Sequence, residues 1–304
     1  METSTEFELL SSDWQDATPE RPVSQPPVLS LIRWGFSTFG PLAPRLAARL
    51  AYLLFTTPRI RARHSSSDEW LEKARRFEIP YKSFRLKAYE WGEGERIILL
   101  IHGWESRGTA LRSFVPALLE RGFRVVAFDG PAHGDSEGKR TNIRHFAGAI
   151  RSIILELGGV YGIIGHSFGG ASTIYALGLL NSGLRMSKAV FIATPASVIP
   201  IYEDIVRTLR LPPSVAMHFK NLMERIAGRP LVDLDATRGM ASRHIGKILL
   251  IHDRQDTVVP LEGSLAMAEA WENAHLLLTE GYGHYRLMKN PDLISRVGEF
   301  FGEE

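Results

Sequence analysis

Gly165-His166-Ser167-Phe168-Gly169 follows an apolar run at residues 160–164 and precedes an apolar helical pattern at residues 168–181. Between a strand and a helix, a serine flanked by glycines is typical of a tight turn that exposes the hydroxyl as a nucleophile. The glycines let the strand and the helix approach each other closely. A phosphate-binding turn is the alternative, but the sequence contains no Gly-x-Gly-x-x-Gly pattern. The pattern therefore predicts that Ser167 is a catalytic nucleophile.

A serine nucleophile needs a base, and the base needs a carboxylate that orients it. Of the ten histidines, His284 lies just beyond the last strand pattern, residues 275–279. Two acids, Asp253 and Asp256, follow the preceding strand pattern and compete for the role of orienting carboxylate. We favour Asp256, which lies at the loop tip before a Val-Val-Pro sequence, and keep Asp253 as the alternative. The chain order of serine, acid and histidine is typical of one hydrolase fold.

Acyl transfer also needs hydrogen-bond donors for the oxyanion that forms in the transition state. The backbone N–H of Phe168 is one candidate, because it follows the nucleophile at the start of a helix, where the helix dipole stabilises negative charge. The other candidate is the backbone N–H of Trp104, in the His102-Gly103-Trp104 loop that follows the strand pattern at residues 96–101. These two N–H groups predict an oxyanion hole beside Ser167.

Alternating strand and helix patterns from about residue 79 predict the scaffold that positions these residues. Two short strands are expected over residues 79–91, and mostly apolar strands separated by helices follow. Apolar strands of this kind indicate a doubly wound, mostly parallel α/β sheet with its site outside the carboxyl ends of the strands. The later strands are expected at residues 96–101, 124–128, 160–164, 188–193, 247–251 and 275–279, and the helices at residues 110–121, 141–157, 168–181, 261–272 and 291–301.

The order of these motifs resembles the α/β-hydrolase superfamily, and in particular its esterases and lipases. The matching pieces are His102-Gly103-Trp104, residues 129–136, the run that contains Gly165, His166, Ser167 and Gly169, then Asp256, and finally Gly283-His284. The resemblance implies that Asp129 and the turn after it are structural rather than a second catalytic site. Relatives usually carry glycine where Asp253 stands, which keeps both aspartates open as partners of His284.

About 50 residues separate the strand patterns at residues 188–193 and 247–251, more than one crossover needs. Helical patterns at residues 200–209 and 214–227 predict a small helical insertion, residues 196–243, which resembles the cap that covers the pocket in this superfamily. Its mostly apolar side chains favour a carboxylic ester with a small or medium acyl chain as the substrate. A thioesterase, an amidase or a C–C bond hydrolase on the same triad is the alternative, and so is a non-catalytic binding module.

No cofactor is implied by these motifs. The sequence lacks His-Glu-x-x-His and dense His/Asp clusters, so it predicts no metal site, and its body carries no nucleic-acid-binding footprint. The chain has no cysteine, which excludes disulfides and thiol catalysis. Apolar residues make up 44% and charged residues 23% of the chain, as in soluble globular proteins.

The first 75 residues predict an extension in front of a hydrolase domain of residues 76–304. Residues 1–20 carry six acids and no base, a Pro-rich linker follows, and residues 31–64 carry six arginines and no acid. We expect a helix over residues 45–55, with Pro44 in its first turn. One face of this helix would carry Leu42, Leu46, Leu50 and Leu53.

The leucine face has two interpretations: docking on the body of the protein, or contact with an anionic membrane surface. We favour docking and keep residues 31–64 as a candidate peripheral membrane contact. The start of the chain does not resemble a signal peptide, which predicts a cytoplasmic location. Residues 157–184 lack charged side chains, but their glycines and central His-Ser pair indicate the catalytic turn rather than a membrane-spanning helix.

Overall fold

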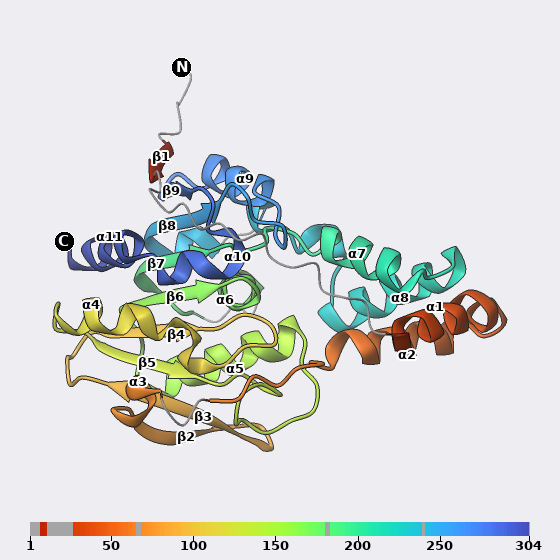
Figure 1. Ribbon diagram of the computed structural model, residues 1–304, viewed down its shortest axis with the longest axis horizontal. Coiled ribbons are helices and arrows are strands. Elements are labelled where there is room, and N and C mark those ends of the chain that lie inside the picture. The colour runs from red at the N-terminus through yellow and green to blue at the C-terminus, as the bar shows by residue number, and fades with distance from the viewer. Residues whose placement is uncertain (1–6, 11–26, 65–67, 180–182, 239–240, 304) are drawn as a thin grey trace.

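The computed structural model describes residues 7–10, 27–64, 68–179, 183–238 and 241–303, which form an α/β body and a helical lobe beside it (Figure 1). Nine strands form one sheet in the order β1-β9-β8-β7-β6-β4-β5-β3-β2. All neighbouring pairs are parallel except β3–β5 and β2–β3, which confirms the mostly parallel α/β sheet. The strands are β1 (Phe7–Leu10), β2 (Arg75–Tyr81), β3 (Phe84–Trp91), β4 (Ile97–Ile101), β5 (Arg124–Phe128), β6 (Gly162–His166), β7 (Met186–Ile192), β8 (Ile245–Asp253) and β9 (Ala274–Thr279).

From β4 onward helices separate the strands, and helices cover both faces of the sheet. The α-helices are α1 (Pro27–Phe39), α2 (Pro44–Thr56), α3 (Glu69–Glu72), α4 (Val115–Leu119), α5 (Ile143–Glu156), α6 (Phe168–Leu179), α7 (Ile199–Leu209), α8 (Pro213–Ala227), α9 (Glu262–Ala270), α10 (Gly283–Arg286) and α11 (Pro291–Gly302). The 3-10 helices are η1 (Gly40–Leu42), η2 (Gly108–Phe114), η3 (Leu231–Asp233), η4 (Ala236–Arg238), η5 (Ala241–His244) and η6 (Leu287–Lys289).

One expected helix is different in the structure. The helix predicted over residues 110–121 is the 3-10 helix η2 followed by the short helix α4. Pro116 lies in the first turn of α4 and has no backbone N–H. Because proline cannot donate to the preceding turn of an α-helix, a continuous helix across this position is disfavoured.

The two faces of the sheet explain why its strands are apolar throughout. In β4, Ile97, Leu99 and Ile101 belong to one core, together with buried side chains of α5, α6 and α9. Ile98 and Leu100 belong to the core on the opposite face, with η2, α4 and α11. Successive side chains of a strand point to opposite faces, so a strand covered on both sides loses the apolar–polar alternation.

The N-terminal extension contains elements that the sequence did not predict. Residues 7–10, within the expected acidic tail, form β1, which pairs in parallel with β9 at the edge of the sheet. Residues 27–39, expected to include the end of the Pro-rich linker, form α1, and Pro27 is its first residue. Proline is well tolerated there because the first N–H groups of a helix have no intrahelical partner. The rest of the predicted tail and linker, residues 1–6 and 11–26, lies outside the described residues.

The helical lobe combines α1 and α2 with α7 and α8 of the insertion between β7 and β8 (Figure 1). Its core contains Ala48 and Ala51 of α2, packed with Val215 and Phe219 of α8. Helix α2 begins at Pro44, as predicted, and it docks on the insertion. The expectation that its leucine face makes this contact is wrong: the small alanines allow a close approach, while Leu42, Leu46, Leu50 and Leu53 remain exposed.

The long charge-free stretch at residues 157–184 is divided between β6 and α6, with the turn at Ser167 between them. None of the helices in the described part of the chain is long and apolar enough to cross a membrane.

Candidate active site

Ser167 occupies a strained turn between β6 and α6. Its φ of 51° is left-handed, and its backbone N–H donates to the carbonyl of Ile192 at 2.8 Å. A Cβ atom on Gly169 would lie 2.5 Å from the carbonyl oxygen of Ile101, and one on Gly165 would lie 2.9 Å from the Cα of Gly170. Both distances are too short for a side chain, which is why the pattern needs glycine on either side of the serine. The turn leaves Ser167 half-buried, so it retains some exposed surface.

His284 and Asp256 meet at the same edge of the sheet, because they follow β9 and β8. The Nδ1 of His284 lies 2.7 Å from Oδ2 of Asp256, and both side chains are buried. The other oxygen of Asp256 accepts from the N–H groups of Val258 at 2.7 Å and Val259 at 2.9 Å. With a carboxylate as its acceptor, Nδ1 carries the proton, and Nε2 is left free to accept one.

The environment of Asp256 keeps it ionised. Burial opposes its charge, but the hydrogen bond and the electrostatic attraction of His284, together with two backbone N–H groups, outweigh burial and hold the pKa of the Asp256 carboxyl below its ordinary value. His252 lies behind it, with Nε2 3.5 Å from Oδ2 of Asp256, and bonds to the carbonyl of Val259 and to the hydroxyl of Ser264. Burial lowers the pKa of His252, so this ring stays neutral and braces the loop.

Asp253, the alternative acid, has different partners. Its Oδ2 accepts from the hydroxyl of Thr279 at 2.8 Å and from the N–H of Tyr282 at 3.0 Å, and its Oδ1 accepts from the N–H of Gln255. These bonds join the end of β8 to the segment that leads from β9 to His284. The structure thus brings Asp256 to the histidine and gives Asp253 a bracing position.

The two predicted oxyanion donors belong to segments next to Ser167: Phe168 follows it in the chain, and the loop of Trp104 packs on its turn. Phe168 is the first residue of α6, and the first N–H groups of a helix have no carbonyl partner within it. The loop that carries Trp104 packs on the turn, because a Cβ atom on Gly103 would lie 3.4 Å from Cβ of Ser167 and 3.0 Å from Nδ1 of His166.

Two buried histidines fix the loop of Trp104. His102 donates from Nδ1 to the carbonyl of Gly103 at 2.7 Å and accepts at Nε2 from the N–H of Gly130 at 2.9 Å. His133 accepts at Nε2 from the N–H of Glu105 at 3.0 Å. A ring that donates with one nitrogen and accepts with the other is neutral. Burial agrees with this, since it lowers the pKa of His102 to about 3 and also lowers that of His133.

His166 connects the turn of Ser167 to His284. Its Nε2 donates to the backbone carbonyl of His284 at 3.0 Å, and the two rings lie 4.7 Å apart. Burial lowers the pKa of His166 to about 3, so the ring is a neutral donor at physiological pH. Sequence reasoning placed His166 in the motif but did not find this contact, which joins residues 118 positions apart.

An aromatic cluster borders the site on the side of the helical lobe. The ring of Trp104 lies edge-on to Phe168 at 5.3 Å and is stacked on Phe55 of α2 at 6.5 Å. Phe55 in turn contacts Phe219 of α8 at 6.4 Å. The extension therefore reaches the site through Phe55, a residue that sequence reasoning did not single out.

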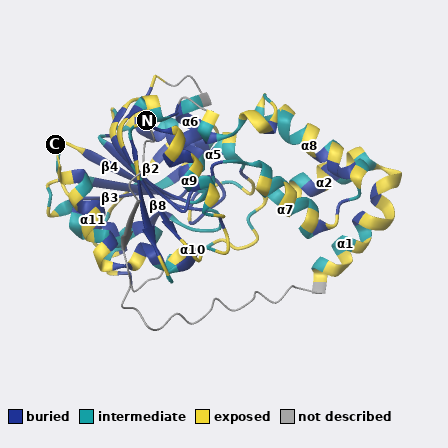
Figure 2. Cartoon of the chain, turned by 90° about the horizontal axis from the view of Figure 1, so that it is seen from above, coloured by how far each residue is buried: buried dark blue, intermediate teal, exposed yellow. Residues whose placement is uncertain are grey.

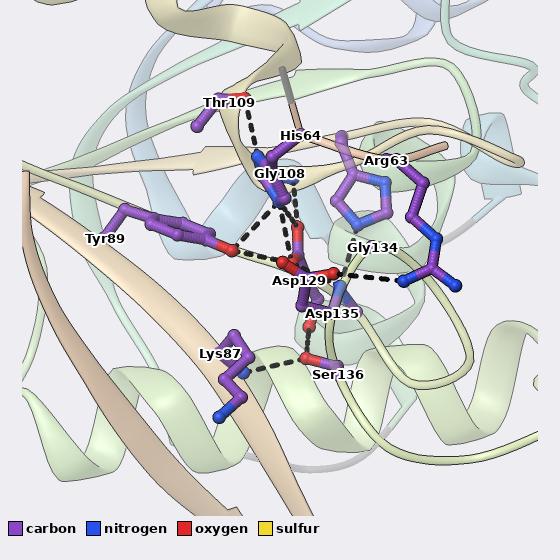
Figure 3. Close-up of polar contacts among 12 residues, drawn as sticks. Arg63, His64, Lys87, Tyr89, Gly108, Thr109, Asp129, Gly134, Asp135 and Ser136 are labelled. Atoms are coloured by element: carbon purple, nitrogen blue, oxygen red, sulfur yellow. Dashed lines mark hydrogen bonds and ion pairs between the residues drawn. The ribbon is translucent and has the colours of Figure 1, made fainter. Parts of the chain in front are cut away.

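A second polar cluster surrounds Asp129, at the end of β5 (Figure 3). Its carboxylate accepts from Nε2 of His64 at 3.0 Å, the hydroxyl of Tyr89 at 2.8 Å, and the N–H groups of Gly108 at 2.6 Å and Asp135 at 2.8 Å. Burial opposes the charge of Asp129, but the hydrogen bond and charge of His64 and the two N–H groups hold the pKa of its carboxyl below the ordinary value.

His64, Asp129 and Asp135 present ligand-type atoms within 4.8 Å of one another. Four donors already occupy the oxygens of Asp129, and Asp135 faces Arg63 at 3.9 Å. We therefore interpret the cluster as a hydrogen-bonded brace, consistent with the structural turn that the sequence indicated. Sequence reasoning did not place His64, Tyr89 or Gly108 in this cluster, and His64 comes from the extension, 65 positions before Asp129.

Parts of this chain are similar in sequence to known proteins. The chain is 33% identical over 106 residues to a non-heme haloperoxidase from Rhodococcus erythropolis, covering 34% of this chain and 38% of that protein. It is 36% identical over 78 residues to a pyrethroid hydrolase from Sphingobium wenxiniae, covering 25% and 28%. The chain thus spans about a third of the length of these curated relatives.

An esterase structure from Pyrococcus furiosus superposes with a TM-score of 0.58 at 20% identity, covering 81% of this chain and 96% of that one, which shows a shared fold. The sequence profile of the Alpha/beta hydrolase family matches residues 98–297, which include every residue of the candidate triad and both oxyanion candidates. By fold and by sequence, the chain belongs to the alpha/beta hydrolase family.

Proposed function

We propose that this protein hydrolyses carboxylic esters through an acyl-enzyme on Ser167. The observation that carries the proposal is the strained turn of Ser167, at the same sheet edge as the buried, hydrogen-bonded pair of His284 and Asp256. A serine hydroxyl is a weak nucleophile until an adjacent base removes its proton, and an oriented neutral imidazole is the base that operates near neutral pH.

In the first step, Nε2 of His284 takes the proton of the Ser167 hydroxyl as its Oγ attacks the ester carbonyl carbon. The N–H groups of Phe168 and Trp104 stabilise the oxyanion, and Asp256 stabilises the imidazolium. The C–O bond to the alcohol breaks, and the alcohol leaves with the proton from Nε2. Water then attacks the acyl-enzyme with His284 again as the base, which releases the acid and restores Ser167.

The aromatic cluster supports a small or medium acyl chain as the substrate group. Phe168 follows the nucleophile directly, and Trp104 and Phe55 extend an apolar surface from it. Such a surface favours an apolar acyl group over a charged one. Ester hydrolysis is also the activity that the name of the Pyrococcus furiosus esterase states.

The test is hydrolysis of p-nitrophenyl esters from acetate to decanoate by the wild type and by Ser167→Ala. We expect turnover of the short and medium esters to fall at least 1000-fold in the variant, because the covalent route is lost. Ser172→Ala is the matched control: its hydroxyl is buried on α6 without a hydrogen-bond partner in the described structure, and its loss should leave turnover unchanged.

A fluorophosphonate probe separates an enzyme from a binding module of the same fold. The probe should label the wild type and Ser172→Ala at Ser167, and it should not label Ser167→Ala. Equal ester turnover in the wild type and Ser167→Ala would show that the proposed mechanism is wrong. Thioester and amide analogues of the best ester decide which acyl bond is cleaved fastest, and a faster thioester or amide would overturn the carboxylesterase assignment.

A further inference from the structure

Large apolar side chains are exposed in one region of the molecule far more than elsewhere. Nine of the 15 exposed large hydrophobic residues of the described structure lie on α1, η1 and α2. These elements belong to the helical lobe, where Figure 2 shows much exposed surface. We call this region the outer face; it consists of Val28, Leu31, Trp34, Phe39, Leu42, Leu46, Leu50, Leu53 and Leu54. Exposed large apolar side chains gathered on consecutive helices of a folded protein indicate an interaction site.

The orientation of α2 produces the outer face. Ala48 and Ala51 are buried against α8, whereas Leu46 is 66% exposed and Leu50 is 50% exposed. Burying the leucines inside the protein would be more favourable than burying alanines, since stabilisation grows with apolar area. The helix does the opposite, and none of the described residues covers its larger apolar side chains.

Charge narrows the identity of that partner. Of the six arginines in residues 31–64, four have partners in the protein: Arg33 bonds to Thr208, Arg61 bonds to Gly134, Arg59 pairs with Glu105, and Arg63 pairs with Asp135. Arg45 and Arg49 have no acidic partner among the described residues, and both are exposed. At 100° per residue they lie along one border of the leucine stripe of α2.

We propose that the outer face binds the surface of an anionic lipid bilayer. On α2, leucines that could enter the apolar layer stand beside arginines that could bind negative headgroups. An exposed tryptophan on the neighbouring helix suits the boundary between these two layers. Trp34 supplies that aromatic group, in edge-on contact with Phe39 at 5.3 Å. A second copy of the chain fits less well, because a symmetric pair would bring Arg45 and Arg49 of both copies together without an acid in residues 31–64 to balance them.

The test is co-flotation of the full-length protein with phosphatidylcholine vesicles that contain 30% phosphatidylserine, compared with pure phosphatidylcholine vesicles. We expect binding to the anionic vesicles and at least tenfold weaker binding to the neutral ones. Each basic side chain near an anionic surface strengthens binding about fivefold, so Arg45→Gln/Arg49→Gln should weaken binding to the anionic vesicles by about 25-fold. Leu46→Gln/Leu50→Gln should weaken binding to both kinds of vesicle by at least tenfold.

Matched controls keep the result specific. Arg185→Gln/Arg243→Gln removes two exposed arginines elsewhere and the same net charge, and Leu155→Gln removes an exposed leucine of α5. Both should bind like the wild type. Circular dichroism should show that every variant is folded, and light scattering reports the oligomeric state. Three results would overturn the proposal. The first is equal vesicle binding by all variants, and the second is no vesicle binding by the folded wild type. The third is an oligomer that Leu46→Gln/Leu50→Gln dissociates, in a protein that binds no vesicles.

Discussion

Two aspartates three positions apart on one loop have acquired different environments. One oxygen of Asp256 faces His284, and the other accepts hydrogen bonds from two backbone N–H groups. These two bonds fix the direction in which the oxygen beside His284 points. Asp253 uses Oδ2 to accept from Thr279 and Tyr282, on the segment that leads to the histidine, and Oδ1 to accept from the N–H of Gln255 in its own loop. The same residue type therefore bonds the proposed base at one position and holds the loops together at the other.

Replacing each acid with its amide should separate these roles. Asp256→Asn can no longer stabilise the imidazolium and favours the wrong tautomer of His284, so we expect kcat to fall roughly 10,000-fold with little change in stability. Asp253→Asn keeps the shape but weakens the acceptor of Thr279 and Tyr282, so the unfolding free energy should fall by about 1–3 kcal/mol with a much smaller effect on kcat. Steady-state kinetics and urea unfolding of both variants check this, and the opposite ranking in kcat would contradict the assignment.

At the scale of elements, the segment between α2 and β2 is tied to the sheet through His64. This histidine contacts Asp129 at the end of β5 and Thr109 in η2. His64→Ala removes one donor from a buried carboxylate, so we expect the unfolding free energy to fall by about 1–3 kcal/mol. Urea unfolding at pH 7.5 measures the change.

The neighbouring Arg63 provides the control for His64. Its side chain is 80% exposed and lies 3.9 Å from Asp135, which is a surface ion pair, so Arg63→Ala should lower the unfolding free energy by at most about 0.5 kcal/mol.

The lowered pKa of Asp129 adds a second readout for His64→Ala. The contribution of Asp129 to stability is present above its unfolded pKa and is lost as the pH falls through its folded pKa. Because His64→Ala raises that folded pKa, the variant should unfold in acid at a higher pH than the wild type, and an unchanged acid transition would count against the brace.

Local pattern predicted the elements that position the triad, but not the contacts between distant segments. Strands β4 to β9 lie within two residues of the expected ranges, because buried parallel strands are continuous apolar runs. Proline in the middle of the expected helix at residues 110–121 produced the 3-10 helix η2 instead. The stacking of Phe55 on Trp104 and the bond from His64 to Asp129 depend on tertiary packing, which periodicity does not contain.

At the scale of the whole molecule, the site is assembled around buried histidines that must stay neutral. His102 holds the loop of Trp104, and His166 holds the backbone of His284. Burial lowers the pKa of both rings to about 3, whereas an unfolded histidine titrates near 6.5. The loops of the site and the stability of the fold therefore depend on the same rings.

The whole protein should consequently lose stability on mild acidification. Between the folded and unfolded pKa values the unfolded state binds a proton that the native state does not, so the unfolding free energy falls as the pH falls, by about 1.4 kcal/mol per pH unit for each ring. His102 and His166 together should lower the unfolding free energy at pH 5.5 by about 3 kcal/mol relative to pH 7.5. Glutamine keeps a donor and an acceptor but does not titrate. In urea unfolding of His102→Gln/His166→Gln, the difference in unfolding free energy between pH 7.5 and pH 5.5 should therefore be smaller than in the wild type by about 3 kcal/mol. The control is His275→Gln, at an exposed position of β9, which should show the same difference as the wild type. The same pH difference in all three proteins would mean that these two rings are not what couples the fold to pH.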